Sequence, residues 1–199
     1  MADPEPGRGE VVVAVEAAGV NFVDGLIVEG RYQIKPPLPF TPGSEVAGVI
    51  TATGDDVTGV AIGDRVMAHP WLGGFASHVV SPATAVTPLP LGVTVGQAAV
   101  LGQSYSTMLY AYTRRTAVEA GEWVAVLGAG GGIGLAAVDL AAALGARVVA
   151  CASSPAKLAA ARAAGAEATV HYDDPDVDLK AAIRDATGGG ADVLVDPVG

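Results

Sequence analysis

Cysteine and positive charge are both scarce in this sequence. Cys151 is the one cysteine among 199 residues, which excludes an internal disulfide and a zinc lobe built from several cysteines. Such cysteine use is typical of a reducing compartment, so we expect the protein in the cytoplasm. Lys and Arg number 11 against 21 Asp and Glu, which gives a net charge of −10. This balance argues against nucleic acid and anionic membranes as partners, since both select for basic clusters.

Long apolar runs are missing as well. No run approaches the roughly 20 residues that a membrane-spanning helix needs, and no apolar segment of the secretory kind follows Met1. Hydrophobic residues nevertheless make up 51% of the chain, so a sizeable core can form. We therefore expect one large or two small globular domains.

Proline is scarce only in the second half of the chain, because ten of the 13 prolines lie in the first hundred residues. Proline interrupts helices, so the first half cannot be mainly helical. Short β-rich runs predict a small β-barrel or sandwich there, at 10–16, Val46–Thr53, 63–67 and 77–80. Residues 103–115 are typical of a helix that links the two halves.

The second half alternates strands and helices. Strands are predicted at 123–127, Arg147–Ala152, 168–170 and 192–195, and helices at 133–144, 155–164 and 177–187. Ser154 before Pro155 is typical of a helix N-cap, and Gly165 and Gly188 stand where helices end. This alternation predicts a doubly wound parallel sheet with strand order 3-2-1-4, and hence an α/β fold class.

A glycine-rich turn lies between the first of these strands and the first helix. Glycine lets the backbone turn tightly and lets a pyrophosphate approach it, and the helix N-terminus offers free N–H groups to phosphate. The strand–turn–helix context predicts dinucleotide binding, although a turn that only packs the helix on the strand has the same pattern. The predicted cofactor-binding residues of the turn are Ala129, Gly130, Gly131, Gly132, Ile133 and Gly134.

The end of the second strand indicates which dinucleotide is bound. NAD-binding folds place an acidic residue about 20 residues after the glycine turn, on the ribose hydroxyls. Here Ser153 and Ser154 follow the strand, and Lys157 comes one helical turn later. Hydroxyls and a cation suit a 2′-phosphate, so we expect NADPH rather than NADH. Helix capping and a solvated lysine are the alternative interpretations.

Six motifs together point to one family: they occupy 17–24, 42–48, 63–66, 120–122, 129–134 and 196–199. Over essentially its whole length the chain resembles the zinc-free quinone oxidoreductases, the zeta-crystallin-like branch of the medium-chain dehydrogenase/reductases. The resemblance implies a GroES-like β-barrel over residues 1–100 and a Rossmann domain over 101–199. It also implies NADPH-dependent hydride transfer to a quinone or enone, and a homodimer. Set against that family, the first hairpin and the later Rossmann strands are missing, so we expect an incomplete chain.

The resemblance also marks individual residues. Asn21, Asp24 and Tyr32 match polar positions that line the active site, where an amide or phenol can stabilise a developing oxyanion. Thr107 matches a position near the nicotinamide, and Tyr172 a phosphate contact. Other interpretations remain: a turn for Asn21, backbone hydrogen bonds for Asp24, and packing for Tyr32. One departure is Leu26, where some relatives carry a second tyrosine.

A metal site has little support in the sequence. Zinc relatives carry His before Glu where this chain has Ser44 and Glu45. Catalytic zinc needs about three nitrogen or sulfur ligands, yet His69, His78, His171 and Cys151 are scattered along the chain. We expect no metal. A 2-enoyl thioester or enone reductase on the same scaffold and a non-catalytic cofactor-binding protein remain alternatives to quinone reduction.

Overall fold

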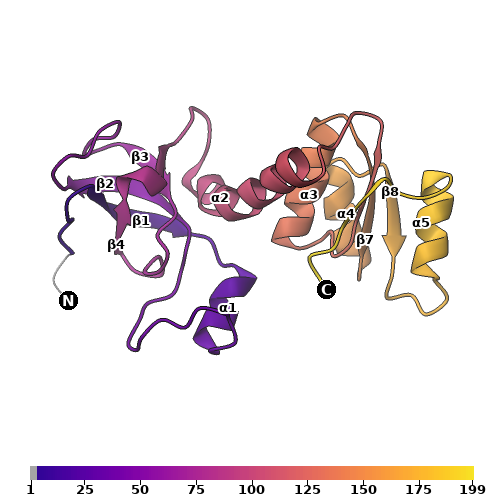
Figure 1. The fold of residues 1–199 in the computed structure, drawn as a ribbon, viewed down its shortest axis with the longest axis horizontal. Helices are drawn as coiled ribbons and strands as arrows, with labels where there is room; N and C mark the ends of the chain where they lie inside the picture. Colours follow the sequence, from indigo (N-terminus) through magenta and orange to yellow (C-terminus); the bar gives the residue numbers. More distant parts are fainter. Residues whose placement is uncertain (1–3) are drawn as a thin grey trace. The chain divides into compact units, whose positions relative to one another are not determined.

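The computed structural model describes residues 4–199 and divides into two compact units, Met1–Gln103 and Ser104–Gly199 (Figure 1). The division falls inside helix α2, Val95–Tyr110. Within residues 4–199, no helix has both the length and the apolar character to cross a bilayer.

The N-terminal unit is built on a five-stranded antiparallel sheet. Its strand order is β4-β1-β2-β3-β5, with β1 at Glu10–Ala18, β2 at Val46–Thr53, β3 at Arg65–Ala68, β4 at His78–Pro82 and β5 at Val86–Pro88. Alternate β-branched residues of β1 and β2, such as Val11, Val13 and Ile50, are fully buried in one cluster. The four expected strands are confirmed. Strand β5 was not expected, because it has three residues and ends at a proline.

Two helices of this unit differ from the sequence-based expectation. Helix α1, Phe22–Val28, was not expected, because seven residues are too few for a helical period to show. Helix α2 begins at Val95 instead of residue 103. Thr94 and Gln97 explain the earlier start: Thr94 N–H donates to Gln97 Oε1 at 3.0 Å, and Gln97 N–H to Thr94 Oγ1 at 3.3 Å. This is a reciprocal capping box. The expected end at Arg115 is reached through a π-helical turn, Ala111–Arg115.

The C-terminal unit is built on a four-stranded parallel sheet (Figure 1). Its order is β8-β7-β6-β9, with β6 at Trp123–Val126, β7 at Arg147–Ala152, β8 at Ala168–His171 and β9 at Val193–Val195. The expected order 3-2-1-4 is confirmed. Helices α3, Gly132–Ala143, α4, Pro155–Ala163, and α5, Leu179–Thr187, connect the strands. Helix α5 begins two residues later than expected, because Asp178 caps it by accepting the N–H of Ala181.

Both faces of the parallel sheet are apolar because successive side chains of a strand point to opposite faces. Val124 and Val126 of β6 pack with α3 and α4, whereas Trp123 and Ala125 pack with α5. Alanine-rich helices approach the sheet closely: Ala137 is completely buried. The unit therefore has helices on both faces, as a doubly wound fold requires.

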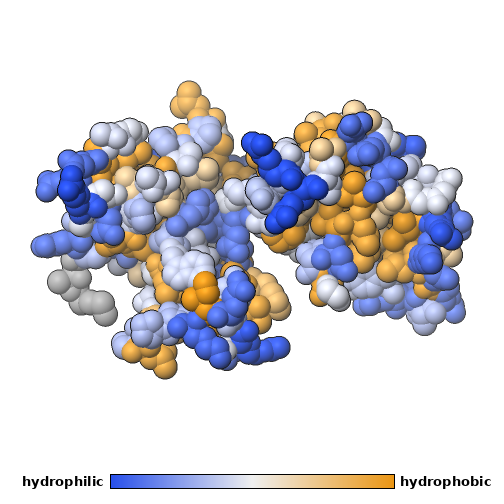
Figure 2. Space-filling model, viewed as in Figure 1, coloured by the Kyte–Doolittle hydropathy of each residue, from blue (hydrophilic) through white to orange (hydrophobic). Residues whose placement is uncertain are grey.

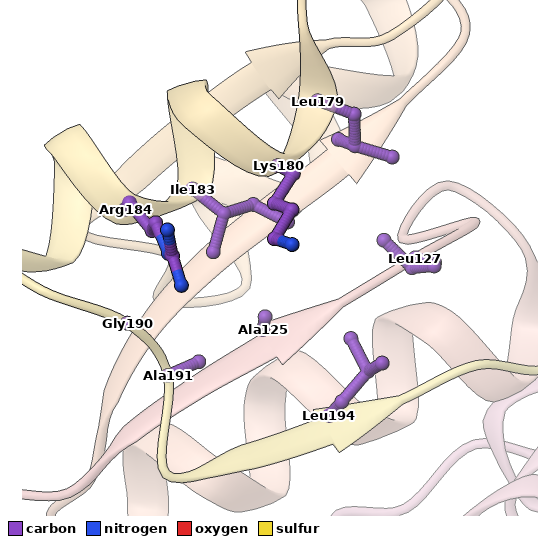
Figure 3. A pocket seen from close by; sticks show the side chains of 9 residues that line it. All are labelled: Ala125, Leu127, Leu179, Lys180, Ile183, Arg184, Gly190, Ala191 and Leu194. Carbon is purple, nitrogen blue, oxygen red and sulfur yellow. The ribbon is translucent and has the colours of Figure 1, made fainter.

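An apolar groove remains between α5 and strands β6 and β9 (Figure 3). It has a volume of about 420 Å³. Figure 3 shows Ile183 of α5 and Leu194 of β9 facing each other across it. Leu194 is 61% exposed, and Figure 2 shows hydrophobic surface exposed on this unit. Strand β9 is an edge of the sheet, so its outer side has no neighbouring strand within residues 4–199.

Candidate cofactor-binding and active-site residues

The glycine-rich turn connects β6 to α3 through a bend that glycine makes possible. Gly128 has φ +60°, in the left-handed region. A Cβ on Gly134 would lie 2.3 Å from the carbonyl oxygen of Gly128, so a side chain there would push α3 off the turn. The Ala129 N–H donates to the Cys151 carbonyl at 3.0 Å, which ties the turn to β7. The turn is therefore held close to the carboxyl ends of both central strands.

The N-terminus of α3 has the features of a phosphate site. Gly131 is its N-cap residue, and no side chain caps the helix. The first-turn N–H groups at 132–134 thus face outward with the positive end of the helix dipole. A Cβ on Gly131 would meet only the Gly128 carbonyl oxygen, at 3.6 Å, so the space beside Gly131 is open. These features fit the pyrophosphate of a dinucleotide.

Lys157 lies over this turn. A Cβ on Gly130 would be 2.4 Å from Lys157 Cγ, so the aliphatic stem of the lysine packs on the Gly130 backbone. Lys157 Nζ donates to Ser153 Oγ at 2.8 Å, and the Lys157 N–H donates to Ser154 Oγ at 3.4 Å. Ser154 is thus the N-cap that the sequence predicted. The structure brings Ser153, Ser154 and Lys157 together beside the glycine turn, and their role in cofactor binding stays a prediction.

Tyr172 lies at the same end of the sheet, one residue after β8. Its N–H donates to the Ala152 carbonyl at 3.2 Å. The half-buried side chain packs against the buried cluster around Cys151 and Val170. Together with Leu127, Leu179 and Asp196 it lines a cavity of about 170 Å³. Tyr172 therefore follows the end of the outer strand, and its predicted phosphate contact is untested.

Thr107 is an exposed residue of α2 in the C-terminal unit. Two tyrosines, one in α2 and one in the π-helical turn after it, bind α3: Tyr105 Oη donates to Asp139 Oδ2 at 2.8 Å, and Tyr112 Oη to the Ala137 carbonyl at 3.0 Å. Burial, together with the Asp139 carboxylate, raises the pKa of Tyr105 to about 12, so its proton stays in place. Thr107 thus lies on an anchored helix, and its place near a nicotinamide stays a prediction.

Asn21 and Asp24 lie at the N-terminus of α1 in the N-terminal unit. The Asn21 N–H donates to Asp24 Oδ2 at 2.8 Å, and Asp24 is only 4% exposed. Its other oxygen, Oδ1, is buried and has no hydrogen-bond partner within residues 4–199. This geometry is that of a helix-capping carboxylate, the alternative that the sequence left open for Asp24. An active-site role for Asp24 stays a prediction.

Tyr32 follows the same helix. Its N–H donates to the Leu26 carbonyl at 3.1 Å, which closes the C-terminus of α1, and its side chain is half-buried. Asn21 and Tyr32 therefore flank one short helix at opposite ends. Their proposed roles toward an acceptor are untested.

Glu45 is a buried carboxylate beside Asn21 that was not among the residues predicted for the site. Glu45 directly precedes β2 and is 2% exposed. Asn21 Nδ2 donates to its Oε1 at 3.0 Å, and the Gln103 N–H donates to its Oε2 at 2.9 Å. Ser44 beside it donates to Gln103 Oε1 at 3.1 Å. The available signal was a glutamate directly before a buried apolar strand.

The histidines and the cysteine have separate surroundings in their own units. Within residues 4–199, no three His, Cys, Asp or Glu side chains are grouped so that they could hold a metal ion. His69 packs against Gly102, while His171 Nε2 lies 3.0 Å from the Ser153 carbonyl. Cys151 is fully buried, and burial raises the pKa of its thiol to about 11. The thiol is therefore protonated and inert at neutral pH.

Comparison with known sequences gives two overlapping family matches. Residues 7–138 match the alcohol dehydrogenase GroES-like domain, and residues 132–199 match the family described as zinc-binding dehydrogenase. Quinone oxidoreductase-like protein 2 of Rattus norvegicus is 39% identical over 98% of this chain and 56% of its own length. The quinone oxidoreductase of Homo sapiens is 41% identical over 75% of this chain and 46% of its own length.

Solved structures give the same result. The Thermus thermophilus quinone oxidoreductase, described with its NADPH complex, is 38% identical with a TM-score of 0.84, over 100% of this chain and 61% of its own. The Escherichia coli quinone oxidoreductase complexed with NADPH is 30% identical with a TM-score of 0.88, over 95% of this chain and 57% of its own. The chain thus spans about half the length of the curated relatives it matches. It belongs to the medium-chain dehydrogenase/reductase superfamily, in the quinone oxidoreductase branch, and comprises a GroES-like domain and the start of a nucleotide-binding domain.

Proposed function

We propose that the protein carrying this chain is an NADPH-dependent oxidoreductase that transfers hydride, without a metal, to a quinone or another conjugated carbonyl compound. The observation that carries the proposal is the packing of Lys157 on Gly130, with Nζ bonded to Ser153 Oγ at 2.8 Å. A cation and hydroxyls thus stand beside a glycine turn, where NAD-specific folds place a carboxylate. The relatives named above as quinone oxidoreductases, two of them described with NADPH, support the same assignment.

The residues of the C-terminal unit would hold the cofactor. The first-turn N–H groups of α3 would bind the pyrophosphate, because they meet an anion with the positive end of the helix dipole. Ser153, Ser154 and Lys157 would bind the 2′-phosphate through charge-assisted hydrogen bonds. NADPH would supply the hydride, and the protein supplies orientation and electrostatics. Thr107 and Tyr172 would add contacts to the nicotinamide and to a phosphate.

Asn21 and Tyr32 would act on the acceptor. A carbonyl that receives hydride develops negative charge on its oxygen, which a fixed N–H or O–H donor stabilises. The Asn21 amide, held by Glu45 Oε1, is such a donor. The Tyr32 phenol could both donate a hydrogen bond and deliver a proton. Asp24 would support this end of the site by capping α1.

A turnover assay tests this function. The purified protein is incubated with NADPH, then with NADH, against a panel of quinones, enones and 2-enoyl thioesters, and cofactor oxidation is followed by absorbance. We expect NADPH-dependent reduction with quinones preferred. Preference for a 2-enoyl thioester would assign the protein to the enoyl reductases, and failure with every acceptor would overturn the proposal. Gel filtration of the same sample tests the expected homodimer, and fractionation of the source cells tests the expected cytoplasmic location.

A further inference from the structure

Glu45 is a buried carboxylate that the proposed chemistry does not use directly. It is 2% exposed and among the largest side chains that are fully buried. Its hydrogen-bond partners, Asn21 Nδ2 and the Gln103 N–H, are both neutral donors. A buried carboxylate with neutral partners costs folding free energy, so stability alone does not account for a charge at this position.

The surroundings of Glu45 leave it almost no freedom to move. A Cβ on Gly19 would lie 2.5 Å from Glu45 Oε1 and 2.8 Å from its Cγ. The Gly19 N–H donates to the Glu45 carbonyl at 3.0 Å. The Gln103 N–H belongs to the backbone of α2, so it cannot turn away from Oε2. Glu45 is thus fixed by packing on one side and by a backbone amide on the other.

The chemistry of the two groups then determines how Asn21 is oriented. An ionised carboxylate only accepts hydrogen bonds, whereas a carboxamide has a donor end and an acceptor end. Asn21 must therefore turn Nδ2 toward Glu45, which sets the direction of its second N–H and of Oδ1. A donor contributes to catalysis only when it is aimed beforehand at the developing charge.

We propose that Glu45 is a positioning residue, which fixes the Asn21 carboxamide in the orientation that serves the acceptor. This inference rests on the proposed function of Asn21. Glu45 acts through Asn21, and the hydrogen bond from the Gln103 N–H fixes the position of Glu45 relative to α2. The carboxylate is needed because it accepts on both oxygens, so it can bind the fixed Gln103 N–H and still accept from the Asn21 amide.

Glu45→Gln is the decisive variant because it keeps the shape and removes one acceptor. The introduced glutamine would turn its carbonyl oxygen to the immobile Gln103 N–H, which leaves its NH2 group facing Asn21. The Asn21 carboxamide would then rotate to present Oδ1, so its donor and acceptor ends exchange places. Because the buried charge is gone, we expect an unchanged or raised Tm. We expect kcat to fall by roughly tenfold to a hundredfold, since one aimed donor is lost.

The kinetic test is a double-mutant cycle with Asn21→Ala in the full protein, with NADPH and the best quinone. If Glu45 acts through Asn21, the double variant is no slower than Asn21→Ala alone. The NADPH Kd stays unchanged throughout, since the proposed cofactor residues lie in the other unit. Ser44→Ala, which loses a contact to Gln103 and none to Asn21, is the matched control and keeps kcat within about twofold. Additive losses, or full activity of Glu45→Gln, would overturn the proposal.

A measurement on the unmodified protein tests the orientation independently of turnover and of variant folding. In amide NMR spectra, one Nδ2 proton of Asn21 should be shifted downfield and protected from solvent exchange by Glu45. Fast exchange of both protons would show that the carboxamide is not held, and would overturn the inference. If the protein reduces no acceptor, the proposed function fails, while this spectrum still decides whether Glu45 holds Asn21.

Discussion

Lys157 packs its aliphatic stem against Gly130, so that a methyl group on Gly130 would lie 2.4 Å from Lys157 Cγ. Lys157 thereby connects the glycine turn after β6 to the two serines that follow β7. The lysine ammonium is held by Ser153 Oγ at 2.8 Å. A phosphate that reaches Ser153 therefore meets a cation already in place, which lowers the cost of ordering the side chain on binding.

Lys157→Ala should weaken the binding of NADPH and leave the binding of NADH unchanged, because only NADPH carries the 2′-phosphate. We expect a roughly tenfold higher Kd for NADPH, equivalent to about 1.4 kcal/mol, and a smaller difference at high salt because the lysine is exposed. Fluorescence titration measures the Kd of each cofactor for both proteins. Lys180→Ala is the control, an exposed lysine on α5. Equal losses for NADPH and NADH would contradict a 2′-phosphate site.

Two glycines of the turn should separate cofactor binding from folding. Gly131→Ala adds a methyl group that meets no protein atom closer than 3.6 Å, so Tm should hold while the dinucleotide loses the open space beside Gly131. Gly134→Ala places a methyl 2.3 Å from the Gly128 carbonyl oxygen and should lower Tm, by an overpacking cost of roughly 1–3 kcal/mol. Thermal unfolding and NADPH titration of both variants decide this. Normal NADPH affinity in Gly131→Ala would place the phosphates elsewhere.

The parallel sheet was predictable because its signals are local in the sequence. Apolar runs of strand length alternate with alanine-rich segments, and glycines such as Gly145, with φ +83°, mark helix ends. Helix α1 has seven residues and gives no such period. The start of α2 was missed although its capping pair, Thr94 and Gln97, was readable.

The candidate site likewise has a part that the sequence predicts and a part that it does not. The glycine turn and the Ser153–Lys157 pair lie on consecutive elements, so spacing alone placed them near each other. Glu45 could not be found by spacing, because its partners lie 24 and 58 residues away. Its role depends on how closely the start of β2 packs against α2, and a single sequence does not show which distant segments pack together.

Activity should not depend on a bound metal. Within residues 4–199, no cluster of potential ligands could hold one, and the stabilisation proposed for the acceptor comes from the Asn21 amide and the Tyr32 phenol. Dialysis against a strong chelator should leave kcat unchanged. Metal analysis of the dialysed sample provides the control. A loss of turnover that added zinc restores would mean that a zinc site exists.

Cys151 should react with thiol reagents only when the unit unfolds. It is completely buried, and burial raises its pKa from 9.0 to about 11. The folded state therefore binds the proton more tightly, so the free energy of unfolding is unaffected below pH 9 and falls as the pH rises toward 11. Alkylation at about pH 8, with and without denaturant, measures access to the thiol. Cys151→Ala should lessen the loss of stability between pH 9 and 11, and rapid alkylation of the folded protein would show that the strand opens.

Residues 1–199 alone should associate through the groove between α5 and β9. Leu194 is 61% exposed beside this groove, and β9 is a sheet edge, a combination that promotes contact between chains. Leu194→Glu should reduce light scattering and leave the fold intact, because the carboxylate would stand near Lys180 and Arg184, which line the same groove.

The matched control for this prediction is Leu91→Glu, which adds the same charge at a leucine that is fully exposed and outside the groove. A general effect of charge on solubility would improve both variants equally, whereas association through the groove would respond only at Leu194. Light scattering and gel filtration at several concentrations separate the two causes, and thermal unfolding checks that each variant folds. A monodisperse monomer of unmodified residues 1–199, with cooperative unfolding and NADPH-dependent turnover, would show that the open groove and edge cause no association.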